Sequence, residues 1–161
     1  MNKDLVIYFS VYGTAKMTAE EIAKQTGADL MEIIPEVPYD SSRDHYNALA
    51  RLAKKEHDEG RRPAIKNELP IKDYDRIFIG YPMWWYTFPM IIYTLFDQYD
   101  FSGKTIIPFN THMGSEDGGT YDTIRELEPG ATVFPGLPIE MQSAERGPEK
   151  AVHEWLGKLG F

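Results

Sequence analysis

The chain of 161 residues is predicted to form a doubly wound α/β fold, a parallel sheet with helices on both faces. Short apolar runs rich in β-branched residues alternate with segments of helical periodicity along the whole sequence. The apolar runs are continuous, which is typical of parallel strands buried on both faces. Because strands that alternate with helices need right-handed crossovers, they are expected to lie parallel in one sheet.

Glycine and proline mark the boundaries of the predicted elements. The helix at 15–25 meets a stop signal at Gly27, the second strand ends at Pro35, and the long charged helix ends at Gly60. Pro148 lies near the first turn of the last helix. The predicted strands are 5–9, 29–34, 76–80, 104–109 and 132–134, and the predicted helices are 15–25, 43–59, 90–99, 121–128 and 148–159.

Composition restricts the function. The length fits a single domain over residues 1–161. With no cysteine, a disulfide framework and thiolate chemistry are excluded, so any redox chemistry would need a bound cofactor. The net charge of −8 argues against nucleic acid and suits docking to a basic protein. No apolar stretch approaches the roughly 20 residues of a membrane span and no signal segment is recognised, so we expect a cytoplasmic location without membrane binding.

Ligands of such sheets bind at the carboxyl ends of the strands. The loops at 10–15, 81–87 and 110–119 are therefore the candidate binding loops. Ser10, Gly13 and Thr14, together with the start of a helix, could surround a phosphate, although an ordinary capped turn has the same composition. The loop matches neither G-x-G-x-x-G nor the P-loop pattern. A dinucleotide fingerprint and nucleoside triphosphate hydrolysis are therefore both disfavoured.

The other two loops have the composition of a site for a flat ligand. Trp84, Trp85 and Tyr86 cannot all face one side of an element, so at least one should face the cleft and stack on a ring; core packing is the alternative. The third loop has three glycines in ten residues. Glycines allow the backbone to approach a ligand closely, although a plain flexible loop has the same composition. His112 would either contact the cofactor or orient this loop, whereas the charge run at 54–59 is expected to be a solvated helix face.

Along its whole length the sequence resembles the flavodoxin family, particularly its short bacterial members. The resemblance rests on Y-P-x-W-W at 81–85, T-H-x-G-S at 111–115 and, in altered form, T-x-x-x-[AV]-x-x-I-A from residue 14. It implies a five-stranded sheet of order 2-1-3-4-5 and an FMN cofactor. The implied phosphate contacts are Ser10, Tyr12, Gly13, Thr14 and Ala15, and the implied ring contacts are Pro82, Met83, Trp84, Trp85, Tyr86, Thr111, His112, Gly114, Ser115 and Gly119.

The first loop departs from the family pattern [ST]-x-T-G-N-T. Tyr12 and Ala15 stand where that pattern has threonine, and Thr14 replaces asparagine, so two side-chain donors are lost. Each is worth roughly 0.5–1.5 kcal/mol, so we expect FMN to bind through backbone donors with reduced affinity.

The resemblance implies electron transfer through FMN to a redox partner protein, which the acidic composition suggests is basic. No catalytic side chain or metal ligand is expected. One alternative is an NAD(P)H-dependent quinone or nitro reductase, although bulky Trp84, Trp85 and Tyr86 would crowd its second substrate. The other alternative is a binding or regulatory domain that has the fold without the flavin.

Overall fold

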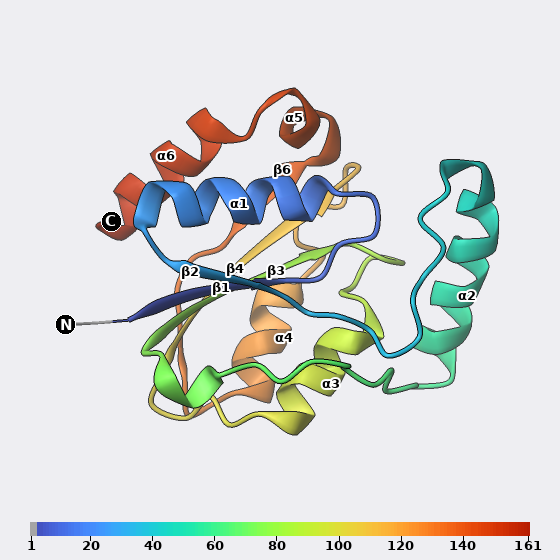
Figure 1. Cartoon of the computed structure of the whole chain (residues 1–161), viewed down its shortest axis with the longest axis horizontal. Coiled ribbons are helices and arrows are strands. Elements are labelled where there is room, and N and C mark those ends of the chain that lie inside the picture. Colours follow the sequence, from blue (N-terminus) through green and yellow to red (C-terminus); the bar gives the residue numbers. More distant parts are fainter. Residues whose placement is uncertain (1–2) are drawn as a thin grey trace.

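The computed structural model describes residues 3–161 and shows one twisted sheet between helices (Figure 1). The strand order is β2-β1-β3-β4-β5, β6 also pairs with β4, and all these pairs are parallel. The predicted doubly wound sheet and its 2-1-3-4-5 order are therefore confirmed. The strands are β1 (Asp4–Tyr8), β2 (Asp29–Glu32), β3 (Arg76–Pro82), β4 (Thr105–His112), β5 (Thr132–Val133) and β6 (Leu137–Glu140).

The helices cover both faces of the sheet, with one exception (Figure 1). Helices α1 (Thr14–Thr26), α5 (Met141–Arg146) and α6 (Glu149–Leu159) lie on one face, and α3 (Met90–Gln98) and α4 (Thr120–Leu127) lie on the other. Helix α2 (Tyr46–Asp58) stands apart from both layers, and two short 3-10 helices, η1 (Arg43–His45) and η2 (Ile71–Asp73), complete the order. Within residues 3–161, no helix is long and apolar enough to cross a bilayer.

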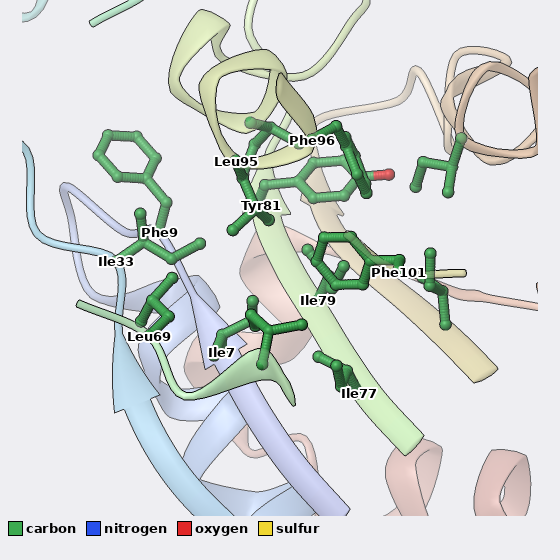
Figure 2. Close-up of a cluster of buried hydrophobic side chains, with 14 of the residues drawn as sticks. Ile7, Phe9, Ile33, Leu69, Ile77, Ile79, Tyr81, Leu95, Phe96 and Phe101 are labelled. Atoms are coloured by element: carbon green, nitrogen blue, oxygen red, sulfur yellow. The ribbon is translucent and has the colours of Figure 1, made fainter. Parts of the chain in front are cut away.

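The strands bury side chains on both faces because successive residues point to opposite sides. Ile7 and Ile79 belong to the cluster under α3, together with Leu95 and Phe101 (Figure 2). Their neighbours along the strands, such as Val6 and Phe78, pack against α1 and α6, where Ile22 and Trp155 cover them. The continuous apolar runs in the sequence reflect this burial on both sides.

The fifth strand is divided into β5 and β6. Pro135 and Gly136 interrupt it, and a Cβ atom at Gly136 would lie 2.5 Å from the Tyr121 ring and 2.8 Å from the Pro108 carbonyl oxygen. This close approach explains why glycine stands there. The sequence predicted the part at 132–134, whereas β6 and the six-residue helix α5 were missed because both are short.

Residues 36–64, here called the rim segment, leave the sheet and return to it. At its base the Glu36 N–H donates to the Ala64 carbonyl (2.8 Å) and the Lys66 N–H donates to the Ile34 carbonyl (2.7 Å). The rim segment carries η1 and α2, so α2 is placed outside the helix layers (Figure 1).

Candidate functional site

Three loops meet at the carboxyl ends of the adjacent strands β1, β3 and β4. The Met83 N–H donates to the Thr111 carbonyl (2.9 Å), which joins the second loop to the third. Strand β1 lies between β2 and β3, so the winding reverses beside the first and second loops. The loops thus lie where open α/β sheets bind ligands.

The β1–α1 loop leaves the start of helix α1 open. The Ser10 hydroxyl oxygen accepts a hydrogen bond from the Gly13 N–H (3.1 Å), and Gly13 adopts φ +93°, which favours glycine. Helix α1 has no side-chain cap and no acidic residue in its first turn. Because first-turn amides have no partner within a helix and carry partial positive charge, this end suits an anion.

Tyr12 of this loop contacts two side chains of the rim segment. Its ring lies 6.2 Å from the Tyr46 ring, and the Arg43 guanidinium lies over it, 5.6 Å from the ring centroid. Its hydroxyl is buried and has no hydrogen-bond partner among residues 3–161. Burial raises the pKa of Tyr12, so the hydroxyl stays protonated as an unused donor.

The β3–α3 loop contains a tight turn in a costly backbone conformation. The N–H and carbonyl groups of Trp84 and Thr87 pair in both directions (2.8 and 3.2 Å), and between them Trp85 and Tyr86 have φ of 54° and 62°. This is the pattern of a type I′ turn, which normally uses Asn-Gly. A left-handed conformation costs a residue with a side chain roughly 1–2 kcal/mol.

The three aromatic residues of this loop have different surroundings. Trp84 packs edge-on against Phe9 (5.4 Å between ring centroids) and Tyr39 (5.2 Å). Trp85 is 47% exposed, and its indole N–H donates to the Ala50 carbonyl of α2 (2.8 Å). Tyr86 is 75% exposed. Trp84 is therefore a half-buried ring packed against the core, and Trp85 and Tyr86 are the more exposed rings.

Buried side chains organise the β4–α4 loop. Asn110 is fully buried; its amide donates to the Glu116 carbonyl (2.9 Å), and its side-chain oxygen accepts from the Tyr121 hydroxyl. The Gly114 N–H donates to His112 Nδ1 (3.0 Å), and the Glu116 carboxylate lies 3.6 Å from Nε2. His112 therefore makes the loop contacts expected of one of its two predicted roles, and its contact with a cofactor stays a prediction.

A second chain of hydrogen bonds holds the start of α4. The Tyr81 and Thr120 hydroxyls lie 2.7 Å apart, and the Thr120 hydroxyl donates to the Asp117 carbonyl (2.7 Å). Burial raises the pKa of the Tyr81 hydroxyl. Asn110, Tyr81 and Thr120 were not among the predicted site residues, although a polar Asn110 after the apolar run 106–109 was a signal in the sequence.

The second and third loops touch at Gly118. A Cβ atom there would lie 2.6 Å from both the Met83 methyl and the Tyr86 carbonyl oxygen, and the φ of +55° also favours glycine. All predicted site residues lie in or beside the three loops. Thr14, Ala15, Thr111 and His112 are buried; Ser10, Tyr12, Gly13, Pro82, Met83, Trp84 and Ser115 are half-buried; Trp85, Tyr86, Gly114 and Gly119 are exposed.

The rim segment is attached to this edge through a buried carboxylate. The Tyr39 hydroxyl donates to the Glu56 carboxylate (2.7 and 3.0 Å), while the Tyr39 ring contacts Phe9 and Trp84. Glu56 is only 8% exposed, which corrects the expectation that the whole run at 54–59 is solvated. Burial raises the pKa of Glu56, against the opposing effects of the Tyr39 hydrogen bond and the Arg61 charge.

A family model described as flavodoxin matches residues 3–159. The chain belongs to the flavodoxin family. This flavodoxin is 34% identical to a candidate flavoprotein from Bacteroides eggerthii, with a TM-score of 0.85 and coverage of 100% of this chain and 99% of that one. A candidate flavoprotein from Bacteroides uniformis is 30% identical (TM-score 0.84; 97% and 98% covered).

More distant structures share the fold. A flavoprotein from Lactobacillus acidophilus, solved in complex with FMN, is 24% identical, with a TM-score of 0.70 and coverage of 91% of this chain and 98% of that one. None of the curated proteins matches the chain.

Proposed function

We propose that this flavodoxin binds FMN at the carboxyl edge of β1, β3 and β4 and serves as an electron-transfer protein. The observation that carries the proposal is the open start of α1, beside the point where the winding reverses, in a chain of this family. The FMN complex of the Lactobacillus acidophilus flavoprotein supports the choice of cofactor.

The residues present fit the two parts of FMN. The Ser10 hydroxyl and the first amides of α1 would hold the phosphate, and the unpartnered Tyr12 hydroxyl is an additional donor nearby. The half-exposed Trp85 and the exposed Tyr86 offer aromatic faces for the ring. Bound FMN would supply the redox chemistry by accepting and releasing electrons at its ring system.

The protein's own contribution would be orientation and electrostatics. The loop after β4 is held by Asn110 and His112, so its backbone N–H groups would meet the ring edge with little reorganisation. Glu116 and Asp117 in this loop place negative charge nearby. Carboxylates disfavour the negative charge that a bound flavin gains on reduction, so we expect these two residues to lower the reduction potential of bound FMN.

Flavin titration of the apoprotein tests cofactor binding. Trp85→Ala should weaken FMN binding by about 1–3 kcal/mol because it removes an accessible aromatic face. Trp84→Ala is the matched variant, and its main effect should be on folding, because the Trp84 ring packs on Phe9 and Tyr39. A colourless protein that does not bind added FMN would contradict the proposal and favour a flavin-free binding domain.

Electron transfer is tested separately. The reduced holoprotein should transfer electrons to a basic acceptor such as cytochrome c, because the chain carries a net charge of −8. The rate should fall between 0.1 and 1 M salt, where the Debye length shrinks from about 10 Å to 3 Å. Rapid NAD(P)H oxidation with a quinone, together with a flat salt profile for cytochrome c, would instead indicate a reductase.

A further inference from the structure

Arg43 brings a cation from the rim segment to the first loop of the site. It lies in η1, far along the sequence from Tyr12, yet its guanidinium carbon is 5.6 Å from the centroid of the Tyr12 ring. Tyr46, three residues further on, covers the same ring at 6.2 Å. The rim segment therefore positions a positive charge against a residue of the predicted phosphate loop.

The guanidinium is oriented but retains freedom to interact with a ligand. Arg43 Nη2 lies 3.0 Å from a carboxylate oxygen of Glu145 in α5, and the two side chains are 64% and 37% exposed. An ion pair this exposed is weak, so a doubly charged ligand could compete for the guanidinium. Glu145 thus competes with a ligand for the Arg43 guanidinium and does not neutralise it permanently.

Residues 10–15 contain no cationic side chain with which to neutralise a phosphate, and Lys16 in the first turn of α1 is exposed. The Ser10 hydroxyl already accepts from Gly13, and the Ala15 methyl is buried. The start of α1 contributes about half an elementary charge, while a phosphate monoester carries nearly two. The chain as a whole has a net charge of −8, which repels an anion.

We propose that Arg43 is a specificity-determining residue that favours flavins carrying a phosphate monoester over neutral flavins. The proposal rests on the proposed function, because it concerns the same flavin site. In this protein a cation from another part of the chain replaces donors that the first loop lacks. The ligand class is a phosphorylated flavin, and riboflavin is its neutral counterpart.

The test compares FMN and riboflavin binding to the apoproteins of the wild type and Arg43→Gln by fluorescence titration. FMN should bind about tenfold more weakly to Arg43→Gln, because a charge-assisted interaction is lost, whereas riboflavin affinity should change less than about twofold. Arg43→Lys should recover part of the FMN affinity, since it keeps the charge without the planar guanidinium. The loss should shrink at 1 M salt.

Three further variants separate this role from a general charge effect. Arg62→Gln removes the same charge from the rim segment, but Arg62 pairs with Asp97 (2.8 Å) and stacks on Tyr93, so FMN affinity should stay nearly constant. Glu145→Gln removes the competing carboxylate and should tighten FMN binding severalfold. Lys16 is a cation in the first turn of α1 but is exposed, so Lys16→Gln should have a smaller effect than Arg43→Gln.

The outcomes distinguish the two proposals. If wild-type protein binds both flavins and Arg43→Gln leaves the ratio of their affinities unchanged, the role of Arg43 is wrong and the flavin site stands. Equal losses for FMN in Arg43→Gln and Arg62→Gln would also overturn it, because only net charge would matter. If wild-type protein binds neither flavin, both proposals fail.

Discussion

Two neighbouring loops at the carboxyl edge, residues 113–119 and the turn at 84–87, are stabilised in different ways. The first is supported by buried side chains, notably Asn110 and His112, which satisfy its backbone groups. The second is closed by two backbone hydrogen bonds while Trp85 and Tyr86 occupy left-handed conformations. A strained turn with exposed aromatic side chains persists only where it is selected for something other than stability. The comparison contrasts a loop held by buried side chains with a turn held by its own backbone hydrogen bonds.

The largest expected effect is on the loop held by buried side chains. Asn110→Leu would leave the Tyr121 hydroxyl and the Glu116 carbonyl without their buried partner, so the free energy of unfolding should fall by about 3 kcal/mol. Urea denaturation measures it. In an Asn110→Leu/Tyr121→Phe double variant the losses should be less than additive, because the two residues share one interaction. A loss below about 0.5 kcal/mol in Asn110→Leu would show that the loop is not supported in this way.

The second prediction separates the two tryptophans by stability. Trp84→Ala should lower the free energy of unfolding by about 3 kcal/mol, because it removes a ring packed on Phe9 and Tyr39. Trp85→Ala should cost less than about 1 kcal/mol, since its ring is half exposed and the alanine loses one hydrogen bond. Equal losses in the two variants would mean that Trp85 also belongs to the core.

The third prediction addresses the left-handed backbone of the turn at 84–87. Replacing Trp85 and Tyr86 together by Asn-Gly should raise the free energy of unfolding by about 1 kcal/mol. Asparagine and glycine adopt the left-handed conformations of these two positions at lower cost than the aromatic residues do. FMN affinity should fall in the same variant, as both exposed rings are lost. If stability falls and affinity is unchanged, the turn has no role in binding and its strain has no functional explanation.

The smallest expected effect concerns the pH dependence of stability through Glu56. Burial raises its pKa in the folded state, so the folded protein holds this proton to higher pH than the unfolded chain does. As the pH rises from the ordinary glutamate range through the folded-state pKa, Glu56 therefore lowers stability, and below that window it has no such effect. Glu56→Gln should remove this decline.

The comparison for Glu56 is the difference between wild-type and Glu56→Gln unfolding free energies across pH 4–8. Subtraction is needed because Asp40, Asp58 and Asp100 have lowered pKa values and act in the opposite direction, losing stability as the pH falls. A difference that does not change with pH would show that the Glu56 carboxylate is effectively solvated.

The fold was largely predictable because local patterns report it directly. The runs at 5–9 and 76–80 are continuous and β-rich, and each became a central strand. The loops were found for the same reason, since they follow those strands. Strand β6 has four residues, one of which is Pro138, and α5 has six residues, so neither is long enough for a periodic signal.

The arrangement of the site was less predictable because it depends on contacts between distant residues. Adjacent tryptophans have the same sequence signal, and the packing of Phe9 and Tyr39 on Trp84 is what places this ring against the core. The sequence predicted a long charged helix over 43–59, but not that Leu49, Ala53 and Glu56 would be buried or that η1 would bring Arg43 to the Tyr12 ring. Arg43 was overlooked for that reason.

The base of the rim segment has a consequence for how such proteins diversify. Its ends are joined by the Glu36–Ala64 and Lys66–Ile34 backbone hydrogen bonds, which do not depend on the side chains between them. The entropy of closing a loop changes slowly with its length, so a segment joined in this way tolerates changes of length at positions that make no contact with the rest of the fold. The Tyr39 ring, which packs on Phe9 and Trp84, is the anchor that a replacement would have to keep. With that anchor retained, residues 36–64 form an insert whose exposed positions can vary independently of the sheet.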